Sequence, residues 1–176
     1  MNSYIIILMI YLLLFITPVM LYLKLKNKVN PLEFLKLNTN AKETILKGFV
    51  INILFIIALV MKKIIFGGNQ INLNIGLLWA SGLLVGVLEE IPFRGFILQK
   101  LLSNMSFIQA NLLTSVLFVL IHIPLWILSD INVLNSISSV FILSFISGYL
   151  FKEYNSLWIP ITCHSVFNIC IWIGLA

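Results

Sequence analysis

The sequence predicts an all-α, polytopic membrane protein, with about six transmembrane helices in a single helical domain over residues 1–176. Three observations predict this class. Of the 176 residues, 61% are hydrophobic and 10% are charged, whereas soluble domains have roughly 45–50% apolar and about 25% charged residues. The apolar residues form runs of the length that crosses a bilayer, about 20 residues per helix. Lysines cluster between these runs.

The expected spans follow from these runs in chain order. The first run has no basic segment before it and no small-residue cleavage site after it, so we expect a retained span rather than a signal peptide. A polar connector from Lys24 to Lys47 follows, in which a short interfacial helix is expected after Pro31. A turn is expected at Gly67, Gly68 and Asn69. The six spans are predicted at Tyr4–Leu23, Leu46–Phe66, Ile75–Leu98, Phe107–Leu128, Ile131–Phe151 and Leu157–Leu175.

The net charge of +5 is interpreted as a topology signal. The basic residues form no stripe interleaved with aromatic residues, so no nucleic-acid partner is expected. Nine of the eleven fall on one side of the predicted spans, and Lys62 and Lys63 fall on the other. The positive-inside rule places the majority side in the cytoplasm and both termini outside. No internal repeat is visible, which leaves an inverted-repeat transporter without support from the sequence.

An adjacent pair of acids, Glu89 and Glu90, lies toward the predicted cytoplasmic end of the third span. An ionised carboxylate in hydrocarbon costs roughly 2.5 kcal/mol or more, so an acid inside a span indicates a functional site by default. The other acids are in connectors or at span ends, where solvated charges are ordinary: Glu33, Glu43, Asp130 and Glu153.

Helical spacing separates the two acids. Arg94 follows Glu90 by four residues, which places both on one helix face and predicts a salt bridge that braces this end of the span. Neighbouring residues on a helix point about 100° apart. We therefore expect the two acids not to share a partner, and Glu89 to face groups on other helices.

Both histidines of the chain, His122 and His164, also lie inside predicted spans. Phe118 precedes the first by four residues and Asn168 follows the second by four, so each pair shares a helix face. A carboxylate and an imidazole can deprotonate a water molecule, while imidazole and carboxamide donors can stabilise an oxyanion. Such a set suffices for peptide hydrolysis without a covalent nucleophile.

A proline lies near each of these groups. Proline removes a backbone donor, so each helix is expected to kink or begin there, around a polar cavity. The alternative is that prolines are simply frequent in transmembrane helices. The three are Pro92, Pro124 and Pro160.

Together, the motifs EExxxR, FxxxH and HxxxN, in separate spans of one chain, resemble the CPBP family, the type II CAAX-protease and bacteriocin-processing intramembrane proteases also called Abi. The resemblance covers residues 77–172 as the expected catalytic core and leaves out residues 1–66, the first two spans and the basic connector. It implies a polar catalytic cavity open to the cytoplasm, in agreement with the charge count. It further implies that Glu89 and His122 activate water, that His164 and Asn168 form the oxyanion site, and that Glu90, Arg94 and Phe118 support them.

The resemblance implies an intramembrane endopeptidase in the cell membrane that acts on a peptide or a protein C-terminus, within the lipid bilayer. Prenylated proteins are one substrate class, and bacterial peptide processing or immunity is the class we favour. Two other functions stay open: a proton- or ion-coupled carrier, and a non-catalytic immunity or binding protein. We expect no cofactor. Zinc stays open because two histidines and a glutamate can ligate it, although the chain has no HExxH motif.

Overall fold

The computed structural model describes residues 9–68, 70–128 and 132–176. The predicted span starts at Tyr4 and Ile131, the turn residue Asn69 and the acid Asp130 lie outside these ranges. Within them the regular structure is helical, and π-helical segments are labelled η. The elements are η1 (Leu12–Ile16), α2 (Thr17–Leu21), η2 (Tyr22–Lys26), α3 (Pro31–Phe34), α4 (Ala41–Phe66), α5 (Leu78–Glu90), η3 (Ile91–Leu98), α6 (Gln99–Leu101), α7 (Phe107–Leu128), α8 (Val133–Tyr154) and α9 (Trp158–Trp172).

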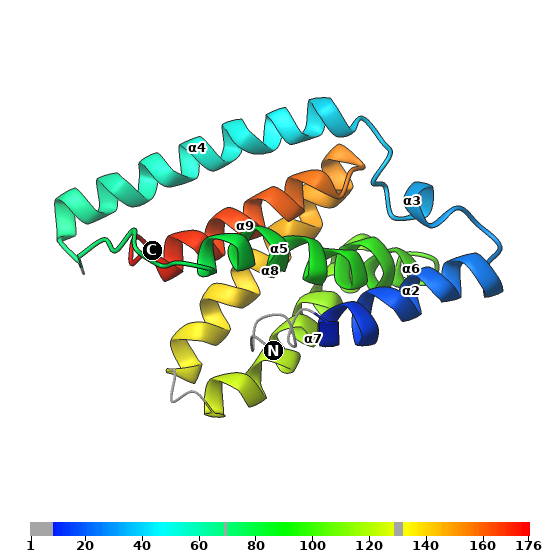
Figure 1. Cartoon of the computed structure of the whole chain (residues 1–176). Helices are drawn as coiled ribbons and strands as arrows, with labels where there is room; N and C mark the ends of the chain where they lie inside the picture. Colours follow the sequence, from blue (N-terminus) through cyan, green and yellow to red (C-terminus); the bar gives the residue numbers. More distant parts are fainter. Residues whose placement is uncertain (1–8, 69, 129–131) are drawn as a thin grey trace.

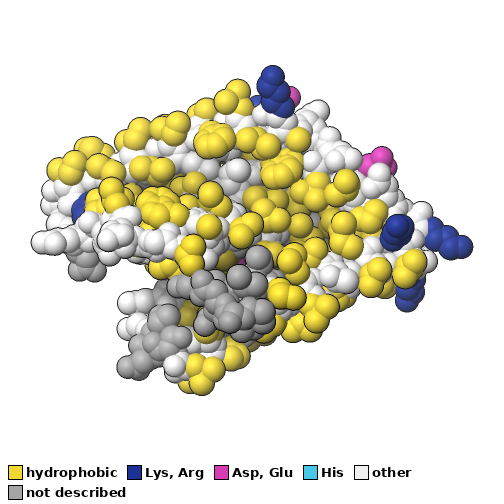
Figure 2. Space-filling view, in the orientation of Figure 1, with side chains coloured by type: hydrophobic (Ala, Val, Ile, Leu, Met, Phe, Trp, Pro, Cys, Tyr) yellow, Lys and Arg dark blue, Asp and Glu magenta, His cyan; other side chains and the backbone are white. Residues whose placement is uncertain are grey.

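The helices confirm the predicted class of a helical membrane protein but not the number of spans. In the described part of the chain, four helices are long and apolar enough to cross a membrane. The α9 helix is shorter, and η3 interrupts the α-helical geometry of the run from Leu78 to Leu101. Hydrophobic side chains cover much of the face visible in Figure 2, as a lipid-facing surface requires. The four candidate spans are Met9–Lys26, Ala41–Phe66, Phe107–Leu128 and Val133–Tyr154.

The α9 helix lies at the centre of the bundle, where it packs against α4, α5 and α8 (Figure 1). One tight contact of this helix is with Gly86 of α5. A Cβ atom at Gly86 would collide with the backbone carbonyl of Ile161 and with the Ser165 side chain. The hydroxyl of Ser165 donates to the carbonyl of Leu83 at 3.0 Å. Small residues allow close helix contact in membranes, and this contact brings the end of α5 against α9.

The Gly86→Val variant is therefore expected to unfold at a lower temperature in detergent than the wild type. Overpacking a tight contact costs about 1–3 kcal/mol. Leu84→Val, on the exposed face of the same helix, is the matched control and should change the melting temperature little. Equal melting temperatures for Gly86→Val and the control would show that the contact between α5 and α9 is not tight.

The lysine-rich connector packs onto one end of the bundle. Its helix α3 begins at Pro31 with Asn30 as the N-cap, whose side chain accepts from the Leu32 amide at 3.0 Å, so the predicted short helix is present. Buried leucines from four parts of the chain meet at this end: Leu23, Leu35, Leu98 and Leu157. At the opposite end, the Lys63 ammonium donates to the carbonyl of Gly174 at 2.9 Å. The two groups of lysines thus lie at opposite ends of the bundle, as the topology prediction requires.

Candidate active site

The two adjacent acids are the last residues of α5, directly before the helix changes to π geometry at Ile91. Pro92 has no amide hydrogen to donate, which favours a departure from the α-helical pattern here. The helical run continues to Leu101 and begins only at Leu78. Glu89 and Glu90 therefore lie near the middle of this helical run.

Glu90 is fully buried and joins two partners through one oxygen. Its Oε1 accepts from Nη1 of Arg94 at 2.9 Å and lies 2.8 Å from Nδ1 of His164. The predicted salt bridge with Arg94 is confirmed. The other end of the guanidinium, Nη2, donates to the hydroxyl and carbonyl oxygens of Ser144, at 2.6 and 2.9 Å. This network joins α5 and η3 to α8 and α9 through buried polar groups.

Glu89 faces both histidines from the neighbouring helices. Its Oε2 lies 3.5 Å from Nε2 of His122 on α7 and 3.7 Å from Nε2 of His164 on α9. The carboxylate is 5% exposed. The structure therefore brings together the acid and both imidazoles that the sequence singled out. The expectation that the two acids share no partner is wrong, because the His164 ring presents one nitrogen to Glu90 and the other to Glu89.

The hydrogen bond on Nδ1 fixes which nitrogen of the His122 ring carries hydrogen. His122 Nδ1 lies 2.7 Å from the carbonyl oxygen of Phe118. A carbonyl only accepts, so the hydrogen is on Nδ1 and Nε2 is an acceptor in the neutral ring. Two acceptors, Oε2 of Glu89 and Nε2 of His122, thus face each other, and none of the residues that the structure describes donates a hydrogen bond to Oε2 of Glu89.

The aromatic ring of Phe118 packs against side chains of this cluster. Its ring centroid lies 4.7 Å from that of His122 and 5.6 Å from that of His164. The guanidinium carbon of Arg94 lies 4.6 Å from the same centroid, a cation–π arrangement. Phe118 is 1% exposed. The ring of Phe118 therefore contacts both histidines and the guanidinium of Arg94.

A cavity of about 710 Å³ opens in front of Glu89, His122 and His164. Asn168, half-buried and one helical turn beyond His164, also lines it. No hydrogen bond to the Asn168 amide is found among the described residues. The walls are mainly apolar and aromatic, with a row of small polar side chains on α8. These walls include Phe55, Val85, Leu125, Trp126, Asn135, Ser136, Ser139, Leu143, Phe167 and Trp172.

The cavity extends toward the end of the bundle that carries few lysines. Lys62, near the end of α4, and Ala176 both line it, as does Asn135 at the beginning of α8. The connectors with most of the lysines lie at the other end. The cavity and the connectors with most of the lysines therefore lie toward opposite ends of the bundle.

Sequence reasoning missed two polar residues of this site. Tyr11, in the N-terminal helical run, donates its hydroxyl to Oε1 of Glu89 at 3.4 Å. Ser144 binds Arg94. The recurrence of serines in the predicted span 131–151 was a usable signal for a polar helix face. Tyr11 had no such signal, since it lies in an apolar run 78 residues before its partner.

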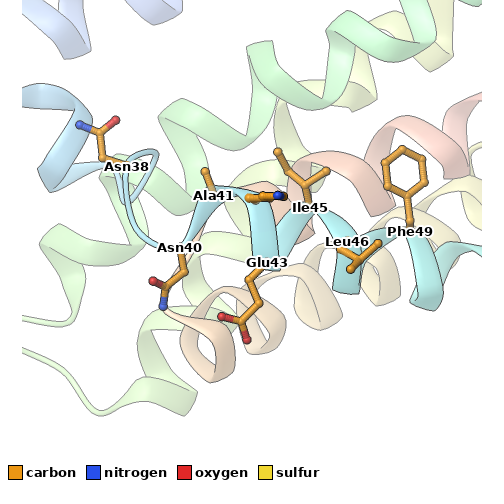
Figure 3. A pocket seen from close by; sticks show the side chains of 8 residues that line it. Asn38, Asn40, Ala41, Glu43, Ile45, Leu46 and Phe49 are labelled. Atoms are coloured by element: carbon orange, nitrogen blue, oxygen red, sulfur yellow. The ribbon is translucent and has the colours of Figure 1, made fainter.

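Two further features carry no catalytic group. No cluster of three or more His, Cys, Asp and Glu side chains within the described ranges has the geometry of a metal site. A second depression, of about 670 Å³, lies over the end of the connector and the first turns of α4 (Figure 3). Its lining includes Asn38, Asn40, Glu43, Leu46 and Phe49, and none of the predicted site residues.

The fold and the site define a helical membrane protein with a buried centre of two glutamates and two histidines. A family model described as type II CAAX prenyl endopeptidase Rce1-like matches residues 70–170. The chain belongs to this family, which is the CPBP family that the three motifs predicted. Neither a curated protein nor a solved structure matches the chain.

Proposed function

We propose that this protein is an intramembrane endopeptidase that hydrolyses peptide bonds with a water molecule activated by Glu89 and His122. The observation that carries the proposal is that two acceptors, Oε2 of Glu89 and Nε2 of His122, face each other at 3.5 Å, with Nε2 of His164 3.7 Å from the same oxygen. These separations are too long for strong direct hydrogen bonds. A water molecule between them supplies two hydrogens, one for the carboxylate and one for an imidazole.

In the proposed reaction, the water oxygen attacks the carbonyl carbon of the scissile bond while its proton passes to Glu89. The carbonyl oxygen becomes an oxyanion in the tetrahedral intermediate. The carbon–nitrogen bond then breaks, and Glu89 returns the proton to the leaving amine. All atoms are accounted for by one water and one peptide bond, so no covalent enzyme intermediate is required.

His164 and Asn168 are the proposed donors to the oxyanion. For His164 to donate from Nε2 while its Nδ1 hydrogen faces Glu90, the ring must be an imidazolium. Glu90 then holds His164 in orientation, much as the aspartate of a Ser-His-Asp triad holds its imidazole. Glu90 thus has two proposed roles, since it orients His164 and also forms the salt bridge with Arg94.

The substrate class is a peptide or a protein C-terminus that enters the apolar cavity from the bilayer or from its surface. The family description names a CAAX prenyl endopeptidase, and a prenylated C-terminus is therefore one candidate substrate. Processing of a peptide, or immunity against one, in a bacterium is the role that we favour. The aromatic walls from α4, α7 and α9 suit an extended apolar segment, and the α8 serines suit its backbone.

The test of this function is cleavage by the purified protein in detergent or proteoliposomes. A mixture of apolar peptides and a farnesylated CAAX peptide serve as probes, and new termini are identified by mass spectrometry. A carrier would instead move protons or ions without producing termini. We expect activity to survive rigorous chelation, with zinc measured by elemental analysis as the control. Loss of activity on chelation, with recovery on adding zinc, would contradict the mechanism without metal.

The lysine distribution supports a topology in the cell membrane with the basic connectors in the cytoplasm. Arg94 is buried and paired with Glu90, so it is left out when the basic residues on each side are counted. The other basic residues still favour the connector side, with Lys62 and Lys63 opposite. Because the cavity extends toward Lys62, we infer that substrate reaches Glu89 from the non-cytoplasmic side.

Cysteine labelling tests this orientation. In a background without Cys163 and Cys170, Ser139→Cys places a thiol in the cavity, and Ser103→Cys places one beside Lys100. A membrane-impermeant maleimide added to intact cells is expected to label the cysteine at position 139. Labelling at position 103 should require permeabilised membranes. The reverse pattern would place the cavity opening in the cytoplasm.

A further inference from the structure

The N-terminal helical run, which lies outside the residues matched by the family model, contributes a side chain to the site. Tyr11 lines the same cavity as Glu89, His122 and His164. Its hydroxyl donates to Oε1 of Glu89 at 3.4 Å. The segment η1, which follows Tyr11 directly, packs against α5 and η3, so the phenol is held beside the acid by helix packing.

The two oxygens of Glu89 have different surroundings. Oε2 faces the two imidazoles, and Oε1 faces the Tyr11 hydroxyl. A carboxylate without a fixed partner can rotate about its terminal torsion, which is broad. A donor on Oε1 limits this rotation and keeps Oε2 directed at the histidines.

We propose that Tyr11 is a positioning residue of the active site, which orients Glu89 through Oε1 so that Oε2 can take the proton from water. This inference rests on the proposed function, since it assigns Tyr11 a role in that reaction. It predicts that the hydroxyl, rather than the ring, is what the site requires. The ring has a packing partner of its own, Phe15, at 5.3 Å between centroids.

The Tyr11→Phe variant keeps the ring and removes the hydroxyl. Removing a hydrogen bond to a charged group typically lowers a reaction rate by about tenfold or more. We expect kcat to fall about tenfold or more, with KM and the melting temperature close to wild type. Tyr22→Phe, the same change farther along the N-terminal run, is the matched control and should retain wild-type kcat. The probe is a fluorogenic peptide spanning a bond that the wild-type protein cleaves.

An unchanged kcat for Tyr11→Phe would overturn the proposal, and so would parallel losses of kcat and melting temperature, which indicate packing. A spectroscopic measurement keeps the proposal testable apart from catalysis. With 3-fluorotyrosine at position 11, the ¹⁹F signal is expected to move in Glu89→Gln and not in Glu153→Gln. A signal insensitive to Glu89→Gln would exclude the contact. If the signal moves but Glu89→Gln still cleaves peptide, the proposed function fails and the contact stands.

Discussion

Replacing Glu89 by glutamine is expected to reduce peptide-bond cleavage by on the order of 10²–10⁴-fold, the usual effect of removing a general base. Glutamine has nearly the same shape but cannot accept the proton of the attacking water. The folded state should not suffer, since the change removes a buried charge whose contacts with the histidines and with the Tyr11 hydroxyl are long, at 3.4 to 3.7 Å. We therefore expect a melting temperature equal to or above that of the wild type, because active sites commonly sacrifice stability for function.

The matched control for this prediction is Glu153→Gln, which removes an exposed acid near the end of α8. It should retain full cleavage activity. Steady-state hydrolysis of one peptide by both purified variants, with thermal unfolding of the same samples, provides the measurement. Substantial activity in Glu89→Gln would contradict the assignment of Glu89 as the base.

Replacing Arg94 by methionine is expected to have the largest effect on stability. The ion pair with Glu90 has both side chains at 1% exposure or less, at 2.9 Å. Removing one partner of such a pair leaves a buried charge and typically costs about 3–5 kcal/mol. The variant would also remove the donor that binds Ser144, and so loosen the contact of η3 with α8. Denaturation in detergent and the yield of folded protein measure the loss.

The double variant Glu90→Leu with Arg94→Met separates stability from catalysis. Replacing a whole buried ion pair by apolar residues is often neutral or stabilising, so the unfolding midpoint should return toward that of the wild type. Cleavage should not return, because His164 loses the carboxylate on its Nδ1. Recovery of both stability and activity would restrict Glu90 to the role of a brace.

Much of the fold could be predicted because long apolar runs have few alternatives in a membrane. The predicted span Phe107–Leu128 coincides with α7, and the predicted span 46–66 ends where α4 ends. The beginning of α4 was placed five residues too late, since polar side chains there were assigned to the connector. The π-helical segment after Glu90 could not be predicted, because its geometry depends on packing around Pro92 and Arg94 as well as on local sequence.

The candidate site was predictable to the extent that its residues repeat at four-residue spacing. This spacing identified Arg94 for Glu90, and it marked the helix faces of His122 and His164. The four-residue spacing could not predict contacts between different helices. The bridge from His164 to both acids, the bond from Ser144 and the approach of Tyr11 all depend on how helices pack. The end of the bundle toward which the cavity extends also depends on helix packing, because a cavity forms where neighbouring helices lie farther apart.

The central claim is that Glu89 is the base of a peptide hydrolase. The most direct measurement compares peptide termini, by mass spectrometry, in host membranes that contain equal amounts of wild-type protein or Glu89→Gln. The proposed function predicts a set of new termini with the wild type that is absent with Glu89→Gln and present with Glu153→Gln. The same termini in all three samples, or none that depend on the protein, would contradict it.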